Sequence, residues 1–309
     1  MIVTLTINPA LDRIISVDRL AFEDRAYINS SRESAGGRGI NASFVINSFG
    51  GKTLAVFISG GDSGKRLEAY LSGWGIPIAV VPVANEIRTN LTITDKHGLT
   101  VNLNEAGPAL SAEEVDRVER KVGESLNHAS WLMPCGSLPP EAPVSFYGKL
   151  IAVARQKRVK TLLRANGDAL REGIEAHPTV AALNQVEAER LLGRTLLTRT
   201  HYLEAAERIR SMGPESVILS LGSRGAVGAF PDGLIEALPP RVDAVCPIGA
   251  GDALSAAYAW AIRRTPNPAD ALRWGVAAGA ASARLPGMSF ASLEQTKEMY
   301  GKVELRRAE

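Results

Sequence analysis

The sequence predicts an α/β fold with a mostly parallel central sheet and a small second sheet. Apolar runs of strand length alternate with helical patterns along most of the chain, as they do where helices connect parallel strands. Glycine-rich turns follow at least five of the predicted strands, which is where α/β folds place their ligand-binding loops. Between residues 87 and 106 the pattern changes to a polar hairpin, which indicates the separate small sheet.

Length and composition indicate an ordinary globular protein, and we expect a single domain over residues 1–309. The formal net charge of +2 does not favour a nucleic-acid or membrane-surface partner. Cys135 and Cys246 lack the spacing of metal ligands, and no run approaches the roughly 18 apolar residues of a membrane span. We therefore expect a cytoplasmic protein with no nucleic-acid partner and no membrane partner.

The first half of the chain predicts strands of the central sheet with helices between them. Pro9 ends the first strand, because proline cannot donate a ladder hydrogen bond and disfavours helix at Asn8. A helical pattern follows the glycine-rich turn at 36–39. The predicted strands cover residues 1–7, 53–58 and 76–83, and the predicted helices cover the run that ends at Phe49 and residues 65–72.

Two further segments predict the small sheet. Residues 13–32 contain short runs of alternating polarity, and residues 90–94 and 100–104 flank a turn as the strands of an antiparallel hairpin do. We expect these segments, about 13–34 and 87–106, to form a lid that stands off the main domain. Because an exposed sheet edge favours pairing with a second copy, we also expect a homodimer through the lid.

The second half of the chain continues the alternation of strands and helices. Ser111 and Glu114 have the spacing of a capping box, in which each side chain accepts a hydrogen bond from the other residue's backbone N–H. Asn184 and Glu187 have the same spacing after a strand, and they can either cap a helix or hold a hydrated cation. The predicted strands cover 130–134, a run from 161, 180–183, 216–221 and an antiparallel 227–230, and the predicted helices cover 111–127, 144–157, 184–193, 253–263, 269–285 and 292–300.

The Gly-Ala-Gly-Asp run at 249–252 precedes a helix-forming segment and predicts an anion site. The first amide N–H groups of a helix lack intrahelical partners and carry the positive end of the helix dipole. Asp252 beside them can act as a general base on a hydroxyl that lies next to a phosphate. The alternative is that Asp252 only caps the helix.

Three other charged residues stand at predicted turns. Asp12 follows the first strand, Arg38 lies among the glycines at 36–39, and Arg88 lies at the root of the hairpin. In α/β sheets such strand ends are where ligands bind, and a guanidinium there can hold an anion. The alternatives are a solvated turn carboxylate for Asp12 and surface charges for the two arginines.

In order and spacing, these turns resemble the phosphofructokinase B branch of the ribokinase-like carbohydrate kinases, over about residues 4–290. The opening from Thr6 to Asp12 resembles the Thr-x-Asn-Pro-Ala-x-Asp of that branch, and 36–41 and 249–252 resemble two family signatures. Residues 136–140, Asn184 with Glu187, and Gly222 with Gly225 also coincide. The resemblance implies a three-layer α/β/α fold with a mostly parallel sheet and a β-sheet lid, and phosphorylation of a sugar with ATP and Mg²⁺.

The resemblance also implies a role for individual residues. It makes Asp252 the base, with the amides of Gly249, Ala250 and Gly251 stabilising the transferring phosphoryl group. The residues implied for the acceptor are Asp12 and Asn41 at the sugar hydroxyls and Gly37, Arg38, Arg88 and Ser137 around its phosphate. Those implied for the nucleotide are Asn184, Ser220, Gly222, Gly225 and Ser282, and Glu187 would organise Mg²⁺ through water.

The implied reaction is the phosphorylation of a ketohexose phosphate to a bisphosphate. Fructose 1-phosphate is the leading acceptor, and tagatose 6-phosphate and fructose 6-phosphate come next. Several residues depart from the branch: Arg38 stands where lysine is common, Arg164 where an acidic residue is common, and Ala182-Leu183 where Lys-Pro is common. Two alternatives therefore stay open: a sugar-phosphate-binding protein that has lost efficient catalysis, and a kinase of a free sugar or nucleoside.

Overall fold

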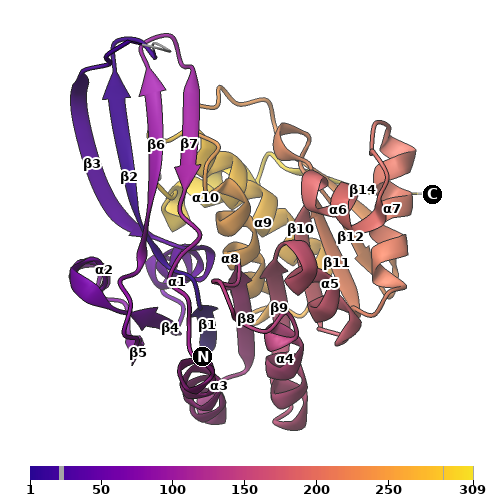
Figure 1. Ribbon diagram of the computed structural model, residues 1–309. Helices are drawn as coiled ribbons and strands as arrows, with labels where there is room; N and C mark the ends of the chain where they lie inside the picture. The colour runs from indigo at the N-terminus through magenta and orange to yellow at the C-terminus, as the bar shows by residue number, and fades with distance from the viewer. Residues whose placement is uncertain (21–23, 288, 309) are drawn as a thin grey trace.

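Ten strands form the central sheet, and helices cover both of its faces (Figure 1). The computed structural model describes residues 1–20, 24–287 and 289–308. From β5 to β11 neighbouring strands run parallel, whereas β12, β13 and β14 are added antiparallel at the other edge. In spatial order the strands are β14 (Glu304–Arg307), β13 (Gly233–Leu238), β12 (Ala226–Phe230), β11 (Ser216–Ser220), β10 (Val180–Asn184), β9 (Lys160–Ala165), β8 (Trp131–Gly136), β1 (Ile2–Thr6), β4 (Thr53–Ser59) and β5 (Ile78–Pro82).

The two helical layers pack on opposite faces of this sheet because side chains alternate along each strand. In β1, Ile2 belongs to the apolar cluster beneath α8 and α9, whereas Val3 and Leu5 belong to the cluster beneath α4 and α5. The first layer holds α1 (Arg38–Ser48), α8 (Ala250–Ile262), α9 (Pro268–Ala283) and α10 (Leu293–Tyr300). The second holds α2 (Gly61–Gly73), α3 (Ala112–Ser125), α4 (Phe146–Gln156), α5 (Gly167–Glu175), α6 (Gln185–Leu192) and α7 (Arg199–Arg210).

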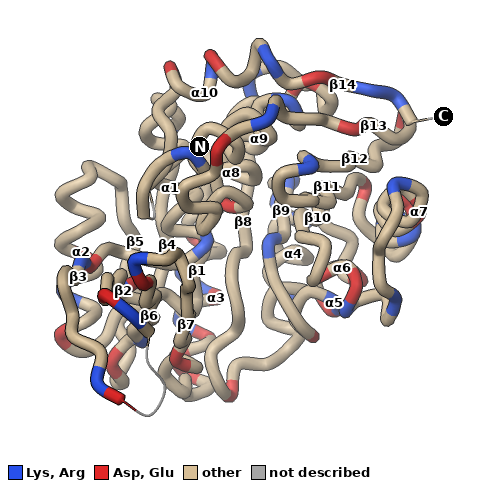
Figure 2. Tube along the Cα trace, turned by 90° about the horizontal axis from the view of Figure 1, so that it is seen from above, with Lys and Arg blue, Asp and Glu red and all other residues tan. Residues whose placement is uncertain are grey.

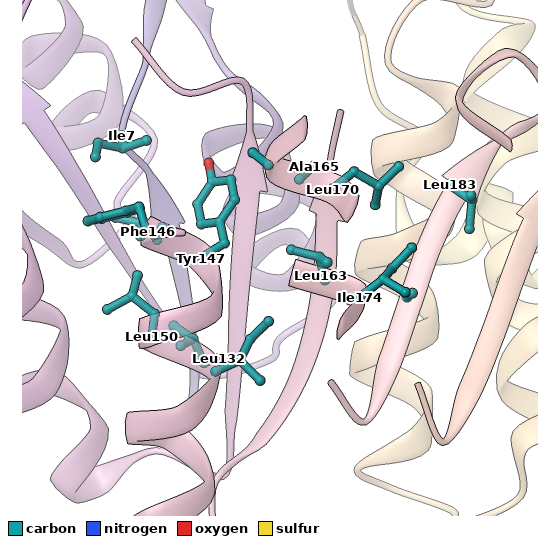
Figure 3. Packing of buried hydrophobic residues seen from close by; sticks show 14 of the residues in the cluster. Ile7, Leu132, Phe146, Tyr147, Leu150, Leu163, Ala165, Leu170, Ile174 and Leu183 are labelled. Atoms are coloured by element: carbon teal, nitrogen blue, oxygen red, sulfur yellow. The ribbon is translucent and has the colours of Figure 1, made fainter. Parts of the chain in front are cut away.

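The second layer seals the sheet with large apolar side chains. Figure 3 shows Phe146 and Leu150 of α4 and Leu170 of α5 packed over Leu132 and Leu163 of the strands beneath them. All five side chains are essentially buried. Burying such a side chain stabilises the fold by about 1.5–3 kcal/mol relative to leaving it exposed, so these contacts hold the helices of this layer on the sheet.

Four strands form the small sheet, which stands beside the central sheet (Figure 1). Its order is β3 (Ile28–Gly36), β2 (Ala10–Val17), β6 (Arg88–Asp95) and β7 (Thr100–Asn104). The predicted hairpin is confirmed as β6 and β7, while β2 pairs antiparallel with β3 and parallel with β6. The register sets Asn90 opposite Asn104 and Thr92 opposite Asn102, so these four polar residues share one face.

Most predicted elements are confirmed, but two helices and two strands are missing from the prediction. Helix α5 begins at Gly167, and the Asn166-Gly167 pair at its start is typical of a turn. Helix α7 is polar along much of its length, so its helical pattern is weak. Strands β13 and β14 extend the antiparallel edge of the sheet. The predicted capping box of Ser111 and Glu114 is present at the start of α3.

Charged residues are spread over the molecule, and the two cysteines are not joined. Lys and Arg are interspersed with Asp and Glu over most elements in the view from above (Figure 2). Cys135 and Cys246 are both free thiols. Within the described ranges, no helix has the length and apolar character needed to cross a membrane.

Tyr147 of α4 provides a test of how the end of β8 is held. Its side chain is fully buried, and its hydroxyl donates to the carbonyl oxygens of Cys135 at 2.9 Å and Gly136 at 3.3 Å. Tyr147→Phe removes the donor from a buried site, so we expect the free energy of unfolding in urea to fall by about 1–3 kcal/mol. Tyr70→Phe, at a half-buried tyrosine of α2, is the control, and equal effects of the two changes would contradict this role.

Candidate active site

Two cavities lie at the carboxyl ends of the parallel strands and meet at the start of α8. The smaller cavity has a volume of about 370 Å³ and lies between the small sheet and the first turn of α1. The larger cavity has a volume of about 790 Å³ and lies between β10, β11 and the helices α8 and α9. Arg38, Gly249 and Asp252 line both cavities, so these residues form the seam between them.

The first turn of α8 forms one side of the seam. The structure corrects the predicted helix start, because Ala250, Gly251 and Asp252 already belong to the helix and Gly249 is its N-cap. Gly249 has a φ of 82°, in the region that glycine adopts without strain. The amide of Ala250 donates to the carbonyl of Pro247, whereas no described residue accepts from the amides of Gly249 and Gly251. Those two N–H groups are therefore available to an anion.

Asp252 is held at the seam from two sides. Its carboxylate is 8% exposed, and Oδ2 accepts a hydrogen bond of 2.9 Å from Asn41 Nδ2 of α1. On the other side, Nε of Arg164, in β9, lies 3.8 Å from Oδ1. Because Oδ1 has no donor at hydrogen-bond distance in the described chain, it can accept a proton from a ligand.

Arg38 bridges the smaller cavity and the strand ends beyond it. The glycine before it, Gly37, has a φ of 126° and caps α1, which brings the first turn of that helix against β1. Arg38 Nη2 donates to Glu187 Oε1 at 2.8 Å, and Nη1 donates to the Ala165 carbonyl at 3.4 Å. Burial acts to lower the pKa of Arg38, but the charges of Glu187 and Asp252 outweigh it and raise that pKa. The guanidinium is therefore a permanent cation beside the seam.

The smaller cavity gathers every residue that the sequence suggested for the acceptor. They come from four places in the chain, namely the start of β2, the N-cap and first turn of α1, the root of the hairpin and the turn after β8. Convergence of these places follows from the parallel sheet, whose strand ends share one edge. The residues are Asp12, Gly37, Arg38, Asn41, Arg88 and Ser137.

Asp12 is a buried carboxyl at the floor of this cavity. Burial, with a smaller contribution from the nearby charge of Asp252, raises the pKa of Asp12 to about 6. A hydrogen bond of 2.8 Å from Asn90 Nδ2 to Asp12 Oδ1 and the charge of Arg88 act in the opposite direction. A carboxyl in this setting can donate to or accept from a sugar hydroxyl.

Arg88 is anchored by backbone oxygens rather than by a carboxylate. Nη1 donates to the Glu105 carbonyl at 3.0 Å, and Nη2 donates to the Asn8 carbonyl at 3.1 Å. Its Nε is buried and has no partner in the described residues. Asn8 also donates to Ser137 Oγ at 3.2 Å, so Arg88, Asn8 and Ser137 form one polar group. The positive charge of Arg88 therefore remains available to an anion.

Several cavity residues were missed by the sequence interpretation. Asn90 and Thr92 of β6 and Asn102 and Asn104 of β7 line the smaller cavity. The signal was present, because polar residues two apart in each strand of a hairpin lie on the same face. Thr6 and Asn8, which belong to the opening motif, also line the cavity without having been assigned a role, as do Asn166 and Ile248.

The larger cavity contains four of the five residues suggested for the nucleotide, namely Asn184, Ser220, Gly222 and Gly225. The fifth, Ser282, does not line the cavity, and its Oγ accepts from the backbone amide of Ala291 at 3.0 Å. Helix periodicity explains the difference, since Val276, Gly279, Ala280 and Ala283 form the stripe of α9 that faces the cavity and Ser282 lies off it. The 239–244 loop, which the sequence interpretation did not use, completes the wall.

Glu187 forms the capping box with Asn184 and also joins two arginines. Oε1 accepts a hydrogen bond from Arg38. Oε2 accepts from Arg164 Nη1 at 3.0 Å and from the backbone N–H of Asn184 at 2.8 Å. Burial opposes ionisation, but Arg164 and Arg38 outweigh it and lower the pKa of Glu187. No cluster of three or more His, Cys, Asp or Glu capable of holding a metal occurs in the described part of the chain.

The residues present therefore fit a hydrated cation rather than a directly ligated one. Glu187 Oε1 keeps a lone pair beyond its bond to Arg38, which is enough for a water molecule of a hydrated Mg²⁺. Mg²⁺ usually keeps several waters and binds through few protein groups together with the phosphates of its ligand. Any such ion would depend mainly on the nucleotide phosphates.

Comparison with known proteins gives the family. The model of the pfkB family carbohydrate kinases matches residues 5–296. The chain is 28% identical to ATP-dependent 6-phosphofructokinase isozyme 2 of Escherichia coli over 97% of both chains. It is 25% identical to 1-phosphofructokinase of Vibrio cholerae over 98% of this chain and 96% of that one.

The fold gives the same result. A crystal structure of phosphofructokinase-2 from Escherichia coli in complex with substrates and products superposes with a TM-score of 0.91 at 29% identity, over 97% of this chain and 98% of that one. The predicted ribokinase-like α/β fold with a small second sheet is confirmed. The chain thus belongs to the pfkB family of carbohydrate kinases and is an ATP-dependent sugar kinase.

Proposed function

We propose that this kinase transfers a phosphoryl group from ATP to a ketohexose phosphate, with fructose 1-phosphate as the leading acceptor and a bisphosphate as the product. The observation that carries the proposal is the position of Asp252 at the seam between the two cavities. Phosphoryl transfer needs the acceptor and the nucleotide in line with a base between them. Two cavities that share one buried carboxylate provide that arrangement.

In this proposal the acceptor occupies the smaller cavity and ATP the larger one. Asp252 Oδ1 takes the proton of the attacking hydroxyl, while the bond from Asn41 keeps the carboxylate oriented. The free amides of Gly249 and Gly251 stabilise negative charge on the transferring group, and Ala250 contributes to the shape of the turn. Mg²⁺, organised through water by Glu187, supplies neutralisation of the nucleotide phosphates when it is bound.

The polar group at the hairpin root supports an acceptor that already carries a phosphate. Arg88 and Ser137 lie together on the wall of the smaller cavity, and Arg38 adds a second guanidinium. Charge-assisted bonds from arginine to phosphate are stronger than the neutral bonds available to a sugar hydroxyl. The names of the relatives also point to phosphorylated fructose, at either position 1 or position 6. Tagatose 6-phosphate and fructose 6-phosphate are therefore the next candidates.

We further propose that the small sheet is the lid of one kinase domain and the dimer contact of a cytoplasmic enzyme. Its face opposite the cavity is apolar at the hairpin, where Leu91 pairs with Leu103 and Ile93 with Val101, and carries Arg13 and Glu33 on the neighbouring strands. Leu103 and Ile28 are more than half exposed. A second copy packed on this face would remove that apolar surface from water. The two free thiols agree with a reducing compartment.

A substrate panel tests the reaction. ADP release with Mg²⁺ and ATP should be fastest, as kcat/KM, for fructose 1-phosphate, and at least about 10-fold slower for fructose and for nucleosides, which lack a phosphate for Arg88. Asp252→Asn is the control for the chemical step, and it should lower kcat by about 10² or more while leaving both affinities nearly unchanged. Equal rates on free and phosphorylated sugars, or near-normal turnover of the variant, would contradict the proposal.

A second experiment tests the phosphate site. Arg88→Ala should raise KM for the sugar phosphate by about 10- to 100-fold, because a buried charge-assisted contact is lost, while KM for ATP changes little. Arg66→Ala, at an arginine that pairs with Glu33 on the surface, is the matched control and should leave both constants unchanged. If Arg88→Ala weakens only ATP, the phosphate site is wrongly placed.

A further inference from the structure

Arg164 places a buried guanidinium beside the seam, and the reaction described above gives it no role. The side chain comes from β9 and is 7% exposed. Nη1 donates to Glu187, whereas Nε lies 3.8 Å from Asp252 Oδ1 and has no partner among the described residues. Burying a cation with an unused hydrogen-bond donor costs free energy. We therefore expect a bound ligand to provide the missing acceptor.

The position of Nη2, the third nitrogen of the Arg164 guanidinium, indicates where a ligand could bind it. A Cβ atom built on Gly251 would lie 2.7 Å from Arg164 Nη2, so the guanidinium packs against the first turn of α8. Arg164 also lines the larger cavity. Nη2 therefore lies beside the same turn that carries the free amides of Gly249 and Gly251. Arg164, Gly249 and Gly251 all line the larger cavity.

The ion pairs at the seam leave the hydrogen bonding of Arg164 incomplete. Glu187 is shared between Arg38 and Arg164, so one carboxylate accepts from two guanidinium groups. Asp252 lies within ion-pair distance of Arg164, but among the described residues it accepts a hydrogen bond from Asn41 and none from Arg164. A phosphate at the seam would complete the hydrogen bonding of Arg164.

We infer that Arg164 is a phosphate-binding residue whose guanidinium contacts the terminal phosphate of the bound nucleoside triphosphate. The inference rests on the proposed function, because it takes the larger cavity as the nucleotide site. A fixed guanidinium at this position supplies charge that phosphoryl-transfer sites otherwise obtain from metal ions. The triphosphate should therefore retain affinity for this protein when Mg²⁺ is removed, and ADP, which lacks the terminal phosphate, should depend less on Arg164.

Calorimetric titration with the non-hydrolysable analogue adenylyl imidodiphosphate in EDTA tests this assignment. Arg164→Met should lower the affinity for the analogue by about 10- to 100-fold, the range expected for losing a charge-assisted contact, and the affinity for ADP by less than about 3-fold. Binding of fructose 1-phosphate should change by less than about 3-fold. Arg199→Met is the matched control, because it removes an arginine from another buried glutamate, Glu236, outside both cavities.

A second variant keeps the test decisive if Arg164→Met does not fold. Arg164→Met combined with Glu187→Gln removes the carboxylate charge together with the guanidinium charge, and Glu187→Gln alone is its reference. The loss specific to the analogue should persist in that comparison. Equal losses for the analogue and ADP would indicate a merely structural role and overturn the assignment.

Two further outcomes separate this inference from the proposed reaction. A wild-type protein that binds the analogue only when Mg²⁺ is present would overturn the role of Arg164 while leaving the kinase reaction intact. A wild-type protein that binds the analogue in EDTA through Arg164 but phosphorylates no sugar phosphate would support the role of Arg164 and remove the proposed acceptor.

Discussion

The position of one buried carboxylate, Asp252, is the constraint on which the rest of the site depends. It lies in the first turn of α8, so its position is fixed by how closely that helix packs on α9. Glycine makes this packing possible, because a Cβ on Gly275 would lie 2.8 Å from the Leu254 carbonyl and one on Gly279 would lie 3.0 Å from the Ala250 carbonyl. Small residues in α9 thus bring the anion-binding turn to the strand ends.

The network around Asp252 also joins the two halves of the sheet. Glu187 follows β10, Arg164 lies in β9, and Arg38 opens α1 next to β1. Their ion pairs connect residues as far apart as 149 positions in sequence, in a region where burial strengthens each interaction. This network places charged groups at the seam. Asp12 and Arg88, outside the network, add charged groups to the wall of the smaller cavity.

The sequence predicted the fold class and the acceptor cavity because both depend on local patterns. Strand ends in a parallel sheet meet at one edge, so the sequence pattern indicated Asp12 and Arg38 as ligand-binding residues, and the family resemblance added Ser137. Pairing between distant side chains carries no such pattern, and the bond of Arg38 to Glu187 was therefore missed. Ser282 was assigned by resemblance, and the rotation of α9 turns it away from the cavity.

A crystal structure with fructose 1-phosphate and adenylyl imidodiphosphate bound together tests the central claim most directly. The expected result is the sugar in the smaller cavity, the nucleotide in the larger one, and the attacking hydroxyl within hydrogen-bond distance of Asp252, about 2.6–3.2 Å. The sugar phosphate should lie against Arg88. Ligands that bind in a single cavity, or that leave Asp252 out of reach of both, would contradict the role of the seam in phosphoryl transfer.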